Sequence, residues 1–175
     1  MTKLLRMASL AATVAAVAFT ASPALAVTAT TDATARVRVL TPLTLTSSQN
    51  LDMGDIVLSG TAPYTATVKL SSGNVRTCAA NVTCSGTTSV AKYDLTGTKG
   101  QAVSISAPNV TLTGPSGTLQ LKTVDASNNP YYATSVTLDA TTGAASVTIG
   151  GEVTVADTTP DGVYTGQFAV TAQYQ

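Results

Sequence analysis

The sequence predicts an all-β domain, either a sandwich or a barrel, and three observations support this prediction. The chain is rich in Thr and Val, whose branched side chains suit a pleated sheet. Short runs that alternate apolar and polar residues recur along the chain between Gly, Pro, Asn and Asp, and no long segment has the 3.6-residue period of a helix. No connection between these runs is long enough for a crossover helix, which favours antiparallel strands.

The first 26 residues predict a secretion signal. Lys3 and Arg6 form a basic start, residues 8–20 are uncharged and rich in Ala and Val, and residues 24–26 place alanines at a cleavage site. A membrane anchor is the alternative, but an apolar run of about 13 residues is shorter than the roughly 20 that span a bilayer. We therefore expect a signal peptide over residues 1–26 and cleavage after Ala26.

Residues 27–175 then form a single domain that is long enough to bury a core. This part has seven basic and nine acidic residues, so its net charge is 7 − 9 = −2. It lacks the basic patch that nucleic-acid binding requires, and it has no second apolar stretch of spanning length. We expect a soluble or assembled domain that binds no nucleic acid.

The first segment of this domain has a two-faced pattern that predicts a strand, or two strands in tandem, ending near Pro42. Its opposite face is polar and includes Arg36 and Arg38. The apolar positions are Val27, Ala29, Ala33, Ala35, Val37 and Val39.

The middle of the chain predicts about nine or ten short strands in order, with no linker that would divide the domain. Glycines and prolines separate them, as in the turn at residues 114–117. Residues 71–88 are expected to form one loop. The expected strands are residues 43–45, 51–58, 66–70, 90–95, 102–106, 110–113, 119–124, 135–138, 145–149 and 152–155.

The last segment has the clearest alternation. After a turn at residues 160–162, a strand over residues 163–174 has one face that is almost entirely apolar, and the other is mostly polar. This pattern alone fits an ordinary core strand as well as it fits a strand with a functional role. The residues of the apolar face are Tyr164, Gly166, Phe168, Val170, Ala172 and Tyr174.

Cys78 and Cys84 are the only cysteines. In an exported protein such a pair predicts a disulfide rather than two free thiols. A metal site lacks support because the chain has no histidine and no further cysteine. We expect a local disulfide that closes a short loop.

Catalysis has few candidate residues. The chain contains no histidine, so the usual general base is missing, and Glu152 is the single glutamate. The pairs Asp52 with Asp55 and Asp157 with Asp161 fit solvated turns better than a calcium site, which needs six or more oxygen ligands. Tyr131 and Tyr132 are an aromatic pair suited to a glycan, or to local packing. We expect no enzyme activity and no cofactor.

Several motifs, taken in order, resemble the bacterial family known as domain of unknown function 4402. They are residues 39–45 (VLTPLTL), 51–56 (LDMGDI), 91–97 (AKYDLTG), 149–155 (IGGEVTV) and 161–174 (DGVYTGQFAVTAQY). Two features depart from the family pattern. The cysteine pair is an insertion, and Met53 stands where an aromatic residue is usual.

That family is similar to immunoglobulin-like fimbrial subunits assembled by the chaperone–usher route. The resemblance implies an antiparallel sandwich that lacks one strand, which a neighbouring subunit supplies by donor-strand complementation. Residues 27–35 correspond to the donor extension, and the last strand, with its penultimate Tyr174, to the strand that a periplasmic chaperone pairs with. The resemblance further implies that the subunit passes through an outer-membrane usher and joins a fimbria on the cell surface. A self-contained secreted or cell-surface binding module, such as a glycan-binding adhesin, is the alternative.

Overall fold

The fold is taken from a computed structural model that describes residues 28–125 and 133–175, together with the backbone alone of Tyr132. The predicted signal peptide and Val27 lie outside these residues. The chain divides into two units, residues 1–37 and 38–175. In the first, residues 28–37 form no strand and are all exposed. The strand predicted up to Pro42 is therefore wrong for the isolated chain, because the alternating residues have no strand to pair with.

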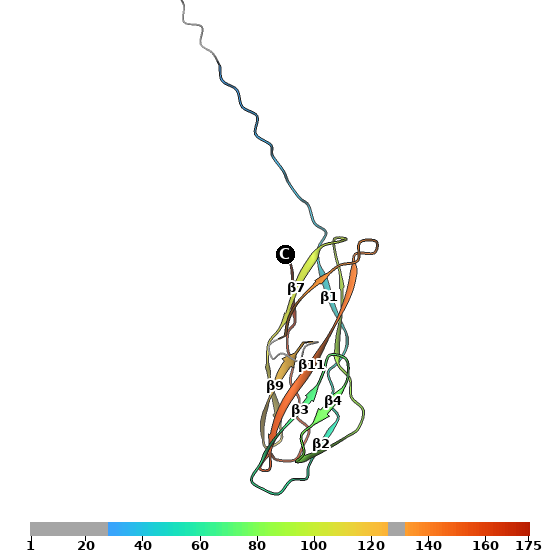
Figure 1. Cartoon of the computed structure of the whole chain (residues 1–175), viewed down its shortest axis with the longest axis vertical. Helices are drawn as coiled ribbons and strands as arrows, with labels where there is room; N and C mark the ends of the chain where they lie inside the picture. The colour runs from blue at the N-terminus through green and yellow to red at the C-terminus, as the bar shows by residue number, and fades with distance from the viewer. Residues whose placement is uncertain (1–27, 126–131) are drawn as a thin grey trace, which may run out of the picture. The chain divides into compact units, whose positions relative to one another are not determined.

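The second unit is an antiparallel β-sandwich, as predicted (Figure 1). Its larger sheet has the strand order β1-β6-β11-β3-β4, with β9 on β11 and β8 on β9. A smaller sheet has the order β10-β7-β12, and β2 pairs with β5. Every pairing is antiparallel. The strands are β1 (Thr44–Gln49), β2 (Asp55–Leu58), β3 (Thr65–Leu70), β4 (Arg76–Cys78), β5 (Val82–Ser85), β6 (Ala91–Thr96), β7 (Ala102–Ala107), β8 (Val110–Gly114), β9 (Gly117–Val124), β10 (Tyr132–Thr137), β11 (Ala144–Ala156) and β12 (Thr171–Tyr174).

Two apolar clusters form the core. The first core lies where β6 and β11 of the larger sheet face β7 of the smaller one, and it includes Leu95, Ile105 and Ile149, all fully buried. The second core joins β3, β5, β9 and the end of β11, and it includes Val68 and Val153. Along β3, buried Ala66, Val68 and Leu70 alternate with exposed threonines, because successive side chains of a strand point to opposite faces.

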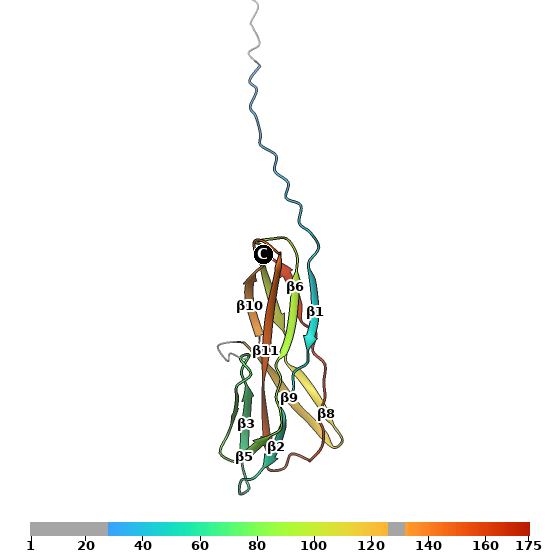
Figure 2. The ribbon, with the colours of Figure 1, turned by 90° about the vertical axis from the view of Figure 1, so that its right-hand side faces the viewer.

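The long strand β11 corrects one prediction. Residues 145–149 and 152–155 were expected to be two strands separated at Gly150 and Gly151, but they belong to one strand of 13 residues. The glycines serve close packing instead of a turn, since a Cβ on Gly150 would overlap the carbonyl oxygen of Leu70. In Figure 2, β11 runs lengthwise through the body, so it connects both cores.

The cysteine region corrects another prediction. Residues 71–88 contain β4 and β5 rather than one loop, and the expected disulfide links Cys78 to Cys84, with their Cα atoms 6.4 Å apart. Since β4 pairs with β3 and β5 pairs with β2, the disulfide connects β2 to the larger sheet.

Candidate functional site: a groove between two open sheet edges

The first and last strands of the body are both at sheet edges. Within the described residues, β1 pairs only with β6 and β12 pairs only with β7. An edge strand presents unpaired backbone N–H and C=O groups that can pair with a further strand. The start of β1 and the C-terminus lie at the same end of the body (Figures 1 and 2).

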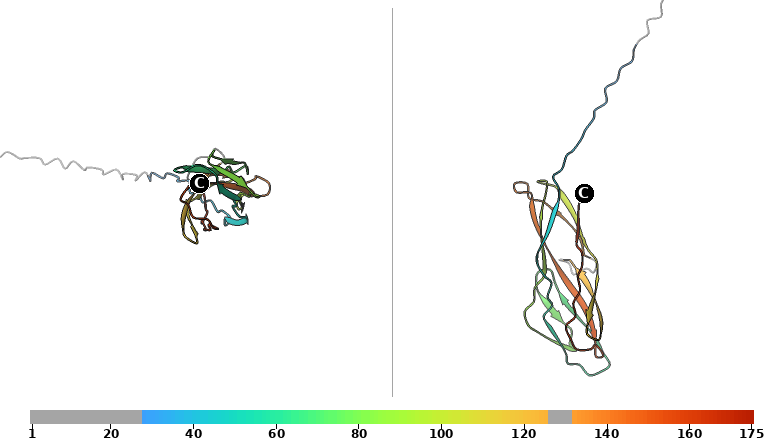
Figure 3. Two further views of the ribbon diagram at one scale, coloured as in Figure 1. Left: turned by 90° about the horizontal axis from the view of Figure 1, so that it is seen from below. Right: turned by 180° about the vertical axis from the view of Figure 1, so that it is seen from behind.

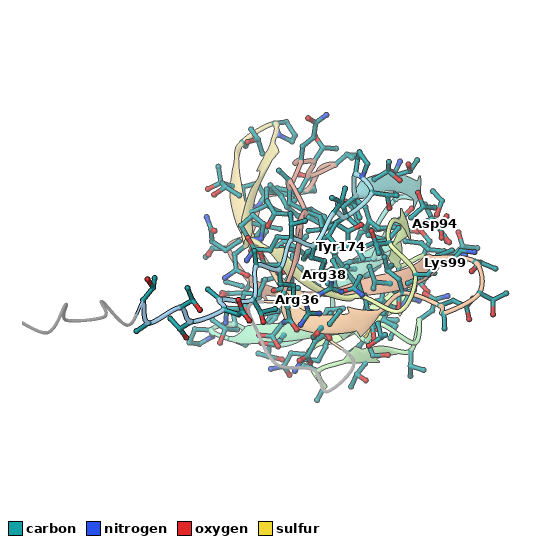
Figure 4. All side chains as sticks on the ribbon, turned by 90° about the horizontal axis from the view of Figure 1, so that it is seen from above. Arg36, Arg38, Asp94, Lys99 and Tyr174 are labelled. Atoms are coloured by element: carbon teal, nitrogen blue, oxygen red, sulfur yellow. A yellow bond between two sulfur atoms is a disulfide. The ribbon has the colours of Figure 1, made fainter. Side chains whose placement is uncertain are left out.

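Tyr174 joins the two edges at that end. Its hydroxyl donates to the carbonyl oxygen of Thr41 at 2.8 Å and accepts from the backbone N–H of Thr98 at 2.7 Å. The backbone N–H of Thr41 in turn donates to the Thr98 hydroxyl at 2.7 Å. We call this the closed end; Figure 4 looks down onto it and labels Tyr174, Lys99 and Asp94.

Beyond the closed end the two edges separate around an open groove of about 1390 Å³. One wall is residues 49–58 and the other is residues 159–168. Each wall has ten residues, so at roughly 3.3 Å per residue the groove is at most about 30 Å long, which suits a strand of nine or ten residues. The floor is apolar and belongs mainly to the second core: Leu112, Leu119, Leu121, Val153 and Val155.

The wall of residues 49–58 is attached to the body at several points. Asp52 and Ser89 exchange backbone hydrogen bonds of 2.7 and 2.9 Å, and β2 pairs with β5. The Arg76 guanidinium donates to the carbonyl oxygens of Met53 at 3.0 Å and Ser85 at 2.6 Å. The disulfide then connects β5 to β4, so this wall has a defined position.

The opposite wall is held more loosely. Thr165 exchanges backbone hydrogen bonds with Thr113 at 2.7 and 3.0 Å, and the Tyr164 hydroxyl donates to the Pro160 carbonyl oxygen at 2.7 Å. Between Thr165 and β12, residues 166–170 make no backbone–backbone hydrogen bond to any described part of the chain. The predicted strand over 163–174 is thus realised only as a bridge and the four residues of β12. Figure 3, from behind, shows this dark red segment along the body.

The side chains of this segment nevertheless alternate as predicted. Tyr164, Phe168, Val170, Ala172 and Tyr174 are half-buried and the residues between them are exposed, whereas Gly166 of the same face is also exposed. By contrast, Val103 and Ile105 of the neighbouring β7 are fully buried. Leu51, Met53, Ile56 and Leu58 on the other wall are half-buried too. Apolar side chains on both walls are therefore covered on one side only.

The predicted site residues fall into three groups. Tyr164, Gly166 and Phe168 line the groove, and Val170, Ala172 and Tyr174 pack against the first core. The donor residues Ala29, Ala33, Ala35, Val37 and Val39 are exposed, with Val37 and Val39 at 88% and 85%. Residues 49–58 form a wall that the sequence reasoning missed, although their motif LDMGDI had marked them. Tyr131 and the side chain of Tyr132 lie outside the described residues.

Other kinds of site find no support in the part of the chain that is described. No group of three His, Cys, Asp or Glu side chains gathers there to hold a metal ion. The same residues contain no helix that is long and apolar enough to span a membrane.

Comparison with known proteins leads to one family. No curated protein and no solved structure matches the chain. The family described as Domain of unknown function (DUF4402) matches residues 43–174, a range that begins just before β1 and ends with β12. It therefore includes both walls of the groove and excludes residues 28–42. The chain belongs to the DUF4402 family.

Proposed function

We propose that this protein is an exported structural subunit of a fimbria- or pilus-like surface polymer, assembled by donor-strand complementation. Residues 27–35 of one copy occupy the groove of the next. The observation that carries this proposal is the groove between residues 49–58 and 159–168, a channel of strand length with an apolar floor. Along residues 166–168 of one wall the backbone makes no backbone hydrogen bond to the described part of the chain. Main-chain hydrogen bonds from an added strand supply affinity, and its alternate side chains enter the groove.

The extension suits this groove in length, and its alternation presents Ala29, Ala33 and Ala35 to a floor lined by leucine and valine side chains. Nine residues of extended chain measure about 30 Å, the length of the groove walls. The exposed alternating residues then gain burial that their own unit does not give them.

The chain geometry favours a neighbour's groove over the subunit's own. Thr41 is held at the closed end by Tyr174 and Thr98, and β1 leads from there toward Gln49, where the groove begins. The extension would have to reverse direction at Thr41 to enter the same groove. Pro42 also restricts Thr41 to extended conformations, which opposes such a reversal.

A periplasmic chaperone and an outer-membrane usher complete the proposal. Before assembly, the half-buried apolar side chains of the walls and the unpaired backbone would promote aggregation. A chaperone that adds a strand along residues 164–174 would protect them in the periplasm until the extension replaces it.

The test is deletion of residues 27–35 from the chain that begins at Val27. Sedimentation velocity should show polymers for the longer chain and monomers for the truncated chain. A synthetic peptide of residues 27–35 should bind the truncated chain and raise its melting temperature. Polymers of the truncated chain contradict the proposal. A longer chain that stays monomeric and gains no stability from the peptide favours a self-contained binding module.

A further inference from the structure

We infer that the groove receives its donor strand in one direction only, with Arg36 and Arg38 of the donor pairing with Asp161 of the acceptor. This inference rests on the proposed assembly and adds to it the residues that set polarity and register. It follows from the charges of the groove, the charges of the extension, and the positions of the groove's two ends.

The charges that line the groove have one sign. Asp52, Asp55 and Asp161 are its charged lining residues, and all three are exposed. None of them forms an ion pair with any described residue. Residues 40–175 contain five basic and eight acidic residues, so the two signs balance outside these three aspartates and the excess negative charge belongs to the groove.

Most basic residues of the body are already engaged. Lys69 and Lys122 pair with Glu152 at 3.0 and 3.4 Å, Lys92 approaches Asp94 at 4.0 Å, and Arg76 donates to backbone carbonyls. Arg36 and Arg38, by contrast, are exposed and form no ion pair within the described part of the chain. Residues 27–39 therefore bring two available cations, next to the body, and one anion, Asp32, to an acidic groove.

The ends of the groove decide how these charges meet. Tyr174 and Thr41 join the two sheet edges at the closed end, and residues 159–162 lie at the far end of their wall from it, so a donor enters there. The donor residues nearest their own body are 36–39, and they remain at this entrance beside Asp161. Residue 27 then points toward the closed end, and the donor runs antiparallel to residues 159–168, the more stable pairing.

The strand pattern makes this contact compatible with burial. Ala33, Ala35 and Val37 are at odd positions of the donor, and Arg36 and Arg38 are on its other face. When the odd residues enter the groove, the two guanidinium groups stay at its rim, where Asp161 is exposed. A slip of one residue would turn the arginines inward.

Charge exchange in the chain from Val27 onward tests the inference. D161K alone and R36E/R38E alone should each raise the concentration at half-assembly roughly fivefold at low salt. The triple variant and a mixture of the two chains should both return toward the original value. About 0.5 M NaCl should shrink all these differences, since surface charges are then screened. D161N should also raise this concentration, whereas the control D94N, which removes a half-buried carboxylate that does not line the groove, should leave it unchanged.

The outcomes separate this inference from the proposed function. If the parent chain assembles but R36E/R38E, whose changes lie in the exposed extension, assembles equally well at low salt, the pairing is wrong and donor-strand assembly stands. A triple variant that assembles no better than D161K overturns the pairing as well. If the parent chain does not assemble at all, the proposed function itself fails.

Discussion

The hydroxyl oxygen of Tyr174 lies 2.8 Å from the carbonyl oxygen of Thr41, although 133 positions separate the two residues. Tyr174 belongs to the final strand β12, and Thr41 lies just before β1. This hydrogen bond joins the edges of the two sheets at one end and leaves them open along the groove. It also fixes the point from which the N-terminal extension departs.

Tyr174→Phe should lower the free energy of unfolding by about 1–2 kcal/mol, because the hydroxyl makes two hydrogen bonds. Tyr164→Phe is the matched control, since that hydroxyl makes a single hydrogen bond within the described residues, to the Pro160 carbonyl oxygen, and its loss should cost about half as much. Urea unfolding of both variants measures the difference. Equal stability of Tyr174→Phe and the parent chain would show that the hydroxyl does not join the two edges.

Gly97→Ala should destabilise the body by about 1–3 kcal/mol, the usual effect of overpacking. A Cβ on Gly97 would overlap the Tyr174 hydroxyl and approach Leu138 at 3.0 Å. Gly117→Ala is the control, because a Cβ there meets nothing within 4 Å. In the double variant G97A/Y174F part of the overlap disappears, so the measured loss should be smaller than the sum of the single losses. Strict additivity would contradict the contact.

Replacing Cys78 and Cys84 together by alanine should cost roughly 2–3 kcal/mol, the chain-entropy value for a short closed loop. Binding of the peptide 27–35 should weaken as well, since the disulfide connects β5, and through it the wall of β2, to the larger sheet. Thermal unfolding with and without dithiothreitol provides the control. The reductant should lower the melting temperature of the parent chain and leave that of the double variant unchanged. If it lowers both melting temperatures, dithiothreitol acts on something other than the disulfide.

Arg76→Ala should free the wall of residues 49–58, because the guanidinium donates to Met53 and Ser85 carbonyl oxygens. Arg76→Lys keeps the charge but loses the forked donor geometry, so it should restore little of the protection of the β2 amides against hydrogen exchange. Hydrogen exchange of the β2 amides measures this, with faster exchange expected in both variants. Lys99→Ala, which removes an exposed cation outside the groove, should leave the β2 amides unchanged.

Glu152→Gln should remove part of the acid sensitivity of the fold. A hydrogen bond from Lys69 holds the pKa of Glu152 below its ordinary value, with Lys122 adding a second one. A carboxyl with a lowered folded-state pKa stabilises the fold fully above its unfolded pKa of about 4.3, and this stabilisation disappears as pH falls through the folded pKa. At pH 7 the variant should be up to about 1 kcal/mol less stable. Urea titrations at neutral and acidic pH should show that the difference in unfolding free energy between the variant and the parent chain shrinks as the pH falls. A difference that stays constant with pH would contradict the linkage.

Much of the local structure was predictable because it depends on neighbours in sequence. The alternation of β3 and of residues 163–174 set which side chains face inward, and the two cysteines had only each other as partners. The strand predicted at residues 27–39 and the split at Gly150 were wrong because both depend on contacts with distant parts of the chain. A strand needs a partner strand, which residues 28–39 lack in the isolated chain. The glycine pair predicted a turn, whereas Gly150 is a glycine because the backbone of Leu70 lies close to it.

The sequence by itself determined the all-β class, the faces of the strands and the family to which the chain belongs. Only the tertiary structure decided where the groove lies, because its walls are 101 or more positions apart in the chain and meet through the pairings of β1 and β12 with other strands. It also decided that Tyr174 closes one end, a contact that requires both termini of the body to reach the same place. Local pattern sets the direction of each side chain, whereas long-range pairing sets which edges remain open.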